Sequence, residues 1–247
     1  MPRWTLLLIP LLVAGCATST PAPVDSPPVD SQAPTSTLSN DVHWVRNSAE
    51  YRAAMIQAYH FATLRLEELV SEREPGTWAV ALDADETVIS NSEYQLELAR
   101  AGERFSEESW DAWVSRKKAP PLPGVLTFLE RVRELGGKIA IVTNRDEQHC
   151  ALTEDDFREY AIPFDVMLCK QDTSEKEPRW EKIETGNASP ELPPLDIVMW
   201  FGDNIGDFPD LDQNLRFAPE EAFDAFGGRF FVLPNPMYGS WVRNPME

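Results

Sequence analysis

The chain shows two patterns of apolar residues, short unbroken runs and longer stretches in which apolar positions recur every three or four residues. A short unbroken run is typical of a strand that is buried on both faces of a parallel sheet. Runs of this kind predict strands at residues 78–82, 138–145, 164–168, 195–201 and 230–233.

The recurring apolar positions predict helices between these strands. The longest helix is expected to begin at a capping box formed by 47–50 and to end near Arg73, before Pro75 and Gly76. Shorter helices are predicted after Ser106, at 124–135 and at 153–160. Ser174 is expected to cap a further helix, with Lys176 in its first turn. Because strands alternate with helices, we expect an α/β fold with a doubly wound parallel sheet and right-handed crossovers.

One segment interrupts this alternation directly after the first strand. Residues 91–120 are rich in Glu and Arg and carry the aromatic side chains of Tyr94, Phe105, Trp110 and Trp113. We interpret this segment as a small helical cap over the strand ends. Its aromatic side chains fit either the packing of the cap itself or contact with a ring-bearing ligand.

The N-terminal region has a composition unlike the rest of the chain. An apolar run at 6–14 is too short to span a bilayer and has the form of a secretory signal. The run leads to Cys16 in a sequence that resembles the bacterial lipobox, and the residue after this cysteine is Ala17. This resemblance implies a lipid anchor on Cys16 and an outer-membrane lipoprotein of a bacterial cell envelope. An ordinary signal peptide with an incidental cysteine is the alternative.

These features divide the chain into three parts. Residues 1–15 are predicted to be a lipoprotein signal peptide, and residues 16–41 a tether rich in Pro, Ser and Thr. Residues 42–247 are predicted to be the folded domain, with the cap at about 91–120. The membrane would therefore be a partner through the lipid on Cys16.

Composition and charge limit the classes of partner that the chain can bind. Apolar residues make up 43% of the chain, which is enough for a substantial core. The formal charge of −19 argues against binding of nucleic acid, because a phosphate backbone needs a basic face. Cys150 and Cys169 could form a disulfide or remain buried thiols. The oligomeric state stays open, a homodimer included.

Polar side chains are predicted to gather at one edge of the sheet. In chain order they are Asp83 and Asp85, Thr143 and Asn144, Lys176, and finally Asp203 and Asp207. Because ligands of parallel sheets bind at the carboxyl ends of the strands, we expect these side chains to surround one site. Asp83 and Asp85 alone would also fit a strand that ends in a solvated acidic turn.

The residue types divide this site into two halves. The four aspartates need a cation to offset their charge, and oxygen ligands favour Mg²⁺ over zinc. Thr143, Asn144 and Lys176 are suited to hold a tetrahedral oxyanion. A phosphate group in contact with both Mg²⁺ and Lys176 would satisfy both halves.

Given a bound phosphoryl group, the first two aspartates can take different roles. Asp83 can attack phosphorus and form an aspartyl-phosphate. Asp85 can protonate the leaving alkoxide and then accept a proton from the hydrolytic water. Because Asp85 must begin protonated while Asp83 stays ionised, we expect a pH optimum on the acidic side of neutrality.

Four motifs in this order resemble those of the haloacid dehalogenase superfamily: Asp83-x-Asp85-x-Thr87, Thr143, Lys176 and Gly202-Asp203-Asn204-x-x-Asp207. The stretches around them are similar to the bacterial class C acid phosphatases. They are residues 47–51, 85–88, 91–92 and 142–145, Ser174-x-Lys176 with Arg179, and 234–241. The resemblance extends over roughly residues 42–241.

The resemblance implies a haloacid dehalogenase-like Rossmannoid fold and a secreted, lipid-anchored, Mg²⁺-dependent phosphomonoesterase. Asp83 would be the nucleophile and a metal ligand, and Asp85 the acid–base, also binding metal through its backbone carbonyl. Asp203 would be a further metal ligand, with Asp207 in or beside its coordination sphere. Thr143 and Lys176 would hold the phosphoryl oxygens.

The implied substrates are small phosphomonoesters, including nucleoside 5′-monophosphates, so the activity would be of the acid phosphatase or 5′-nucleotidase type. The rings expected to stack on a nucleobase are Tyr94, Trp110 and Tyr238. Glu93 replaces a proline that is common among relatives, which leaves the substrate preference open. Three alternatives remain: a phosphotransferase or mutase, a dehalogenase, and a non-catalytic surface lipoprotein. The second acid, Asp85, argues against the dehalogenase.

Overall fold

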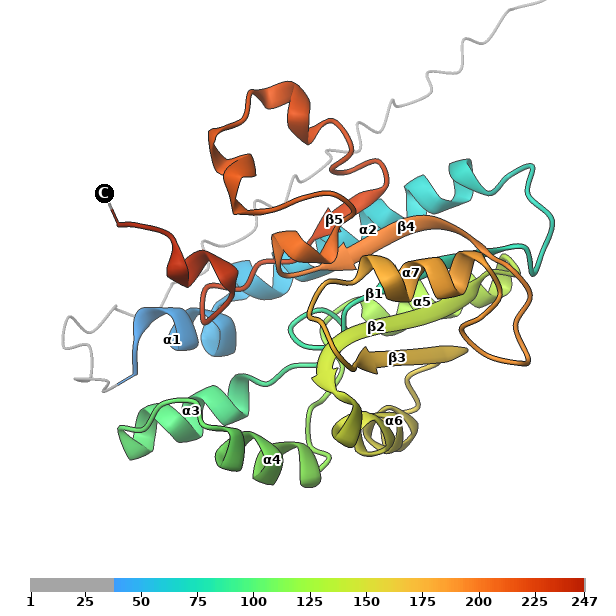
Figure 1. Cartoon of the computed structure of the whole chain (residues 1–247). Helices are drawn as coiled ribbons and strands as arrows, with labels where there is room; N and C mark the ends of the chain where they lie inside the picture. Colours follow the sequence, from blue (N-terminus) through green and yellow to red (C-terminus); the bar gives the residue numbers. More distant parts are fainter. Residues whose placement is uncertain (1–37, 247) are drawn as a thin grey trace, which may run out of the picture. The chain divides into compact units, whose positions relative to one another are not determined.

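The computed structural model describes residues 38–246 (Figure 1). The expected signal peptide at 1–15, the lipidation site Cys16 and most of the tether lie outside the described residues. No helix in the described range is long and apolar enough to cross a membrane.

The centre of the domain is a five-stranded parallel sheet in the order β3-β2-β1-β4-β5 (Figure 1). The strands are β1 (Trp78–Leu82), β2 (Lys138–Asp146), β3 (Val166–Lys170), β4 (Asp196–Gly202) and β5 (Phe230–Val232). The five strands predicted from the unbroken apolar runs are confirmed, with ends shifted by one or two residues. The α/β fold class is also confirmed.

Strand β1 shows why a strand in the middle of this sheet consists of an unbroken apolar run. Its residues are all buried, and they alternate between two hydrophobic cores. Trp78, Val80 and Leu82 face the core that includes Leu66 of α2 (Ala49–Leu69) and Phe128 of α5 (Val125–Glu134).

The opposite face of the sheet has its own core. Ala79 and Ala81 of β1 pack there with Trp180 and Ile183 of α7 (Glu177–Glu184). In Figure 1, α7 covers one face of the sheet, and α2 and α5 cover the other. Because helices cover both faces of the sheet, the fold is doubly wound, as predicted.

The helix ends differ from the predictions in several places. α1 (Asn40–Asn47) begins inside the segment assigned to the tether. Ser48, rather than Asn47, caps α2 by accepting a hydrogen bond from the Tyr51 amide (3.0 Å), and α2 ends at Leu69 rather than near Arg73. α6 (Cys150–Glu159) begins three residues earlier than predicted.

The segment 91–120, the cap, contains α3 (Ser92–Ala101) and α4 (Glu107–Ser115), drawn in green in Figure 1. Ser106 caps α4, as expected. The two chain segments that connect the cap to the sheet run side by side, because Ile89 pairs with Pro121 and the Ser90 amide donates to the Pro120 carbonyl (2.9 Å). These contacts fix the base of the cap at the end of β1.

Short 3₁₀ helices and one disulfide complete the described part of the chain. The 3₁₀ helices are η1 (Glu147–His149), η2 (Ile205–Asp207), η3 (Gln213–Phe217), η4 (Glu220–Phe223) and η5 (Ser240–Arg243). Cys150 and Cys169 form a disulfide with a Cα–Cα distance of 5.9 Å, which joins the start of α6 to β3. The alternative left open by the sequence is thereby decided in favour of pairing.

Candidate active site

Three carboxylates meet at the carboxyl end of the sheet. Asp83 directly follows β1, and Asp203 and Asp207 follow β4. One oxygen from each lies within 4.8 Å of the others. Gly202 allows this approach, since a Cβ atom at that position would lie 2.1 Å from Cβ of Asp207.

Lys176 lies among these carboxylates. Its Nζ is 2.6 Å from Asp83 Oδ1 and 2.7 Å from Asp207 Oδ1, and the residue is only 1% exposed. Lys176 is the N-cap residue of α7, not part of its first turn as predicted, and the Ser174 side chain does not cap the helix. The lysine thus joins the segment before α7 to the ends of β1 and β4.

The three carboxylates outnumber the lysine, and the pKa values of Asp83 and Asp203 are raised mainly by burial and further by neighbouring carboxylates. Burial raises the pKa of Asp83 to about 7; Asp207 and Asp85 add to the rise, and Lys176 opposes it. Burial likewise raises the pKa of Asp203 well above its usual value, with a further contribution from the negative charge of Asp207. A cluster of buried and half-buried oxygen donors with surplus negative charge fits a hard divalent cation.

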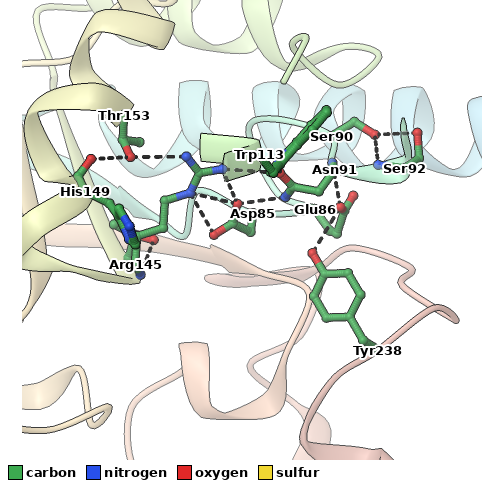
Figure 2. A network of polar contacts seen from close by, with 11 residues as sticks. Asp85, Glu86, Ser90, Asn91, Ser92, Trp113, Arg145, His149, Thr153 and Tyr238 are labelled. Atoms are coloured by element: carbon green, nitrogen blue, oxygen red, sulfur yellow. Dashed lines mark hydrogen bonds and ion pairs between the residues drawn. The ribbon is translucent and has the colours of Figure 1, made fainter. Parts of the chain in front are cut away.

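Asp85 points to a different set of partners. Its carboxylate accepts hydrogen bonds from Arg145 and from the Asn91 side chain, as Figure 2 shows. It is therefore separate from the cluster that Asp83 forms with Asp203 and Asp207. Its position two residues after Asp83 still brings both acids to the same strand end.

The end of β2 carries the predicted oxyanion-binding residues. Thr143 is fully buried, and its hydroxyl accepts a hydrogen bond from the Arg145 amide (3.1 Å). Arg179 of α7 donates to the Thr143 carbonyl and to Asn144 Oδ1, the latter at 2.7 Å. Because Arg179 lies only three residues after Lys176, it holds the end of β2 next to that lysine.

Glu86 was not assigned a role from the sequence. Its side chain is fully buried, and Oε1 accepts hydrogen bonds from the Asn91 amide (2.7 Å) and the Tyr238 hydroxyl (3.0 Å; Figure 2). Oε2 has no hydrogen-bond partner among the described residues. Burial raises the pKa of Glu86 to about 8, partly opposed by the hydrogen bond from Asn91.

Arg145, Asn91 and Asn235 were also missed as site residues. Asn235 donates to Asp203 Oδ2 (2.7 Å), and Arg145 and Asn91 bind Asp85. All three lie in stretches that carried the family resemblance, but nothing in their spacing identified their partners. The available signal was their position, which is near the carboxyl end of a strand for Arg145 and Asn235 and at the cap entry for Asn91.

The three predicted stacking residues lie in different surroundings. Tyr94 is 2% exposed, its ring packs against Trp110 and Trp113, and its hydroxyl is hydrogen-bonded to Ser109. This burial leaves almost none of its surface for a ligand. Trp110 is partly buried and lies under the Arg145 guanidinium, whereas Tyr238 is partly exposed and bonded to Glu86.

A doubly wound parallel sheet with an aspartate cluster and a buried lysine at its carboxyl edge, and with a helical cap after β1, defines a protein of the haloacid dehalogenase type. Residues 18–241 match the family described as HAD superfamily, subfamily IIIB (Acid phosphatase). The chain therefore belongs to this family.

Relatives in bacteria and plants resemble the chain. The structure of the class C acid phosphatase from Bacillus anthracis superimposes with a TM-score of 0.74 at 28% identity, covering 81% of this chain and 84% of that one. Acid phosphatase 1 of Solanum lycopersicum is 30% identical over 158 residues, and a stem 31 kDa glycoprotein of Glycine max is 33% identical over 162. These matches cover 63% and 62% of this chain but only 56% of either plant protein.

Proposed function

We propose that this chain is an acid phosphatase that hydrolyses small phosphomonoesters through an aspartyl-phosphate on Asp83. The observation that carries the proposal is the contact of Asp83 with Lys176, while Asp85 is held in a separate network two residues later. One acid is thus placed beside a cation that can bind phosphate, and the other, held by Arg145, is kept out of that contact and can transfer a proton. Family membership agrees with this activity.

Mg²⁺ is the proposed cofactor, held by Asp83, Asp203 and Asp207, with the backbone carbonyl of Asp85 as a further ligand. The three carboxylates offer only oxygen donors, which favours a hard cation. When bound, Mg²⁺ would offset the negative charge of the carboxylates and polarise the phosphoryl oxygens.

In the first half of the reaction, a carboxylate oxygen of Asp83 forms a bond to phosphorus as the bond to the leaving oxygen breaks. Asp85 gives its proton to that oxygen, so an alcohol departs. In the second half, water attacks phosphorus and gives a proton back to Asp85, while the bond between phosphorus and Asp83 breaks. Inorganic phosphate leaves, and both aspartates return to their starting states.

Thr143, Asn144 and Lys176 would bind the phosphoryl oxygens during these steps. A structure of the class C acid phosphatase from Bacillus anthracis has tungstate bound, and tungstate is a tetrahedral oxyanion like phosphate. That protein shares the fold of this chain, which supports an oxyanion site here as well. Lys176 can exchange its present contacts with two carboxylates for contact with a bound phosphate.

Activity measurements test the mechanism. We expect Asp83→Asn to lower phosphate release from p-nitrophenyl phosphate by roughly 10³-fold or more, because an amide cannot form the intermediate. EDTA should abolish release by the wild type, and Mg²⁺ should restore it. Asp224→Asn, at an exposed aspartate outside the site, is the matched control. An active Asp83→Asn variant or EDTA-insensitive release would refute the mechanism.

The same assay separates hydrolysis from phosphoryl transfer. In the presence of an alcohol acceptor, a phosphatase releases mainly inorganic phosphate, whereas a phosphotransferase produces mainly the new phosphate ester. Absence of any turnover would favour a non-catalytic lipoprotein.

Nucleoside 5′-monophosphates are proposed as one substrate class, with the nucleobase against Tyr238 and Trp110. Tyr94 is left out because its ring is buried. Tyr238→Ala should raise KM roughly 10- to 100-fold for a nucleotide but much less for a small alkyl phosphate, since stacking contributes about 1–3 kcal/mol. Tyr238→Phe keeps the ring and removes the hydroxyl that donates to Glu86, so it should retain the nucleotide preference. Equal effects of Tyr238→Ala on both substrates would exclude stacking.

We also propose that the protein is a lipid-anchored lipoprotein of the bacterial outer membrane. The lipobox-like sequence before Cys16 supports this, and several acyl chains together would make a stable anchor. Expressed in a bacterial host, the full chain should partition into detergent and fractionate with the outer membrane, and Cys16→Ser should remain in the aqueous phase. A wild-type chain found in the aqueous phase would contradict the anchor.

A further inference from the structure

We propose that Arg145 is the positioning residue for the acid–base Asp85, and that it leaves Oδ2 as the carboxyl oxygen that carries the proton. This inference rests on the proposed phosphatase function. It concerns a side chain to which neither the motif spacing nor the family match gives a role.

The hydrogen bonds to Asp85 are distributed unequally. Oδ1 accepts from Arg145 Nη2 (2.7 Å), Arg145 Nε (3.0 Å) and Asn91 Nδ2 (2.7 Å). Oδ2 accepts only from Arg145 Nε, at 3.1 Å, among the described residues. In a protonated carboxyl group, one oxygen is a carbonyl acceptor and the other bears the proton. The three donors fix Oδ1 as the acceptor, so Oδ2 is the oxygen that can pass the proton.

Arg145 is itself held firmly. The residue is only 3% exposed. Its Nη1 donates to the Thr153 hydroxyl (3.1 Å), and this hydroxyl in turn donates to the His149 carbonyl (2.9 Å; Figure 2). A guanidinium keeps its charge at any pH at which proteins are normally folded. The guanidinium is therefore a permanent, immobile donor.

The same guanidinium contacts the cap. Nη2 also donates to Asn91 Oδ1 (3.2 Å), and this oxygen accepts from the Trp113 indole of α4 at 2.7 Å. The Arg145 guanidinium carbon lies 5.2 Å from the centre of the Trp110 ring, also on α4. The orientation of Asp85 is thus tied to the position of the cap, and a lysine could not replace the forked donor.

The chemical consequence depends on the leaving group. When the bond between phosphorus and the leaving oxygen breaks, a basic alkoxide needs the proton from Oδ2, whereas a dinitrophenolate leaves without one. A residue that positions the acid should therefore matter for alkyl phosphates and matter little for dinitrophenyl phosphate. A residue needed only for folding would affect both substrates alike.

The experiment compares kcat/KM of the full chain with Mg²⁺ for an alkyl phosphate and for 2,4-dinitrophenyl phosphate. We expect Arg145→Lys to lower the alkyl value about 10²-fold and the dinitrophenyl value less than about 5-fold. Asp85→Asn should show the same selectivity with a larger loss. Arg158→Lys, at an exposed arginine on α6 that pairs within its own helix, is the matched control and should change neither value.

Two further outcomes complete the test. If Arg145→Lys folds poorly by circular dichroism, Thr153→Val removes the support of Nη1 and should give a weaker loss with the same selectivity. Equal losses for both substrates in the Arg145 and Thr153 variants, with Asp85→Asn still selective, would overturn the role of Arg145. Wild-type inactivity, or equal losses in Asp85→Asn, would instead refute the proposed acid catalysis itself.

Discussion

At the residue scale, three acidic side chains in a stretch of four residues differ in the kind of partner that each one contacts. Asp83 is paired with a lysine, Asp85 with an arginine, and Glu86 with neutral donors only. Since an unpaired buried charge is destabilising, the third of these groups tends to keep its proton. The chain therefore places three acidic side chains with three different kinds of partner side by side.

Glu86 leads to a prediction about stability and pH. Its pKa in the folded protein is about 8, above the ordinary value of 4.5, so the folded state holds the proton more tightly than the unfolded state. Its contribution to the free energy of unfolding is complete below about pH 4.5 and is lost as the pH rises to 8. The slope is about 1.4 kcal/mol per pH unit for one proton.

Glu86→Gln should remove this slope, because glutamine resembles the protonated acid and does not titrate. Urea unfolding in metal-free buffer at pH 5, 6, 7 and 8 measures the difference between the two proteins. Glu107→Gln, at an exposed position in the first turn of α4, is the control and should keep the wild-type slope. Parallel curves for wild type and Glu86→Gln would contradict the prediction.

The strand ends could be predicted from the sequence, but the side-chain pairings could not. The carboxyl ends of parallel strands share an edge, so Asp83, Asp203 and Lys176 could be assigned to one site from the order of elements alone. The pairing of Asp85 with Arg145 depends on the direction of the last residues of β2 and on the packing of the cap against them. Neither leaves a periodic signal in the sequence.

At the element scale, the strands were better predicted than the helix starts. Burial on both faces requires an unbroken apolar run, and this requirement is visible in β1 and β4. A helix start depends on one capping hydrogen bond, and neighbouring polar residues compete for that role. Ser48 took the place predicted for Asn47, and no side chain caps α7.

The disulfide yields a prediction at this scale. Cys150 and Cys169 are 19 residues apart in the sequence, and the bond closes the connection between α6 and β3. A loop of this size contributes about 3 kcal/mol to the free energy of unfolding. Cys150→Ser with Cys169→Ser should lower the unfolding free energy by this amount in urea, and the fold should remain.

Reduction of the wild type supplies the control for the disulfide. Dithiothreitol should destabilise the wild type to the level of the doubly substituted chain and leave that chain unchanged. A wild type insensitive to reductant would show that the two cysteines are not bonded in solution.

At the scale of the whole molecule, the net charge opposes the proposed substrate. The chain carries a formal charge of −19, and a phosphomonoester is an anion. Lys176 and a bound cation act at contact distance, but the remaining charges repel an approaching substrate over longer distances. Association should therefore depend on screening by salt.

We expect kcat/KM for a phosphomonoester to rise roughly two- to fivefold between 0.01 M and 0.15 M ionic strength, as the screening length falls from about 30 to 8 Å. The value of kcat should stay nearly constant, because the bound state is screened little. Sodium chloride and choline chloride should act alike if the effect is general screening. A kcat/KM that falls with salt would mean that the site attracts its substrate through a local positive field.

The strand order sets how much of the chain must be available before the site can form. β1 lies beside β4 in the sheet, although the cap, β2 and β3 come between them in the chain. A nascent chain that has emerged as far as α7 carries Asp83, Asp85 and Lys176 but neither Asp203 nor Asp207. The cluster of Asp83, Asp203 and Asp207 can form only after β4 has been translated and has inserted next to β1. This pairing is non-local in the sequence and is therefore slow to form. The carboxylates of the candidate active site therefore come together only when most of the domain, as far as β4 and Asp207, is available to fold.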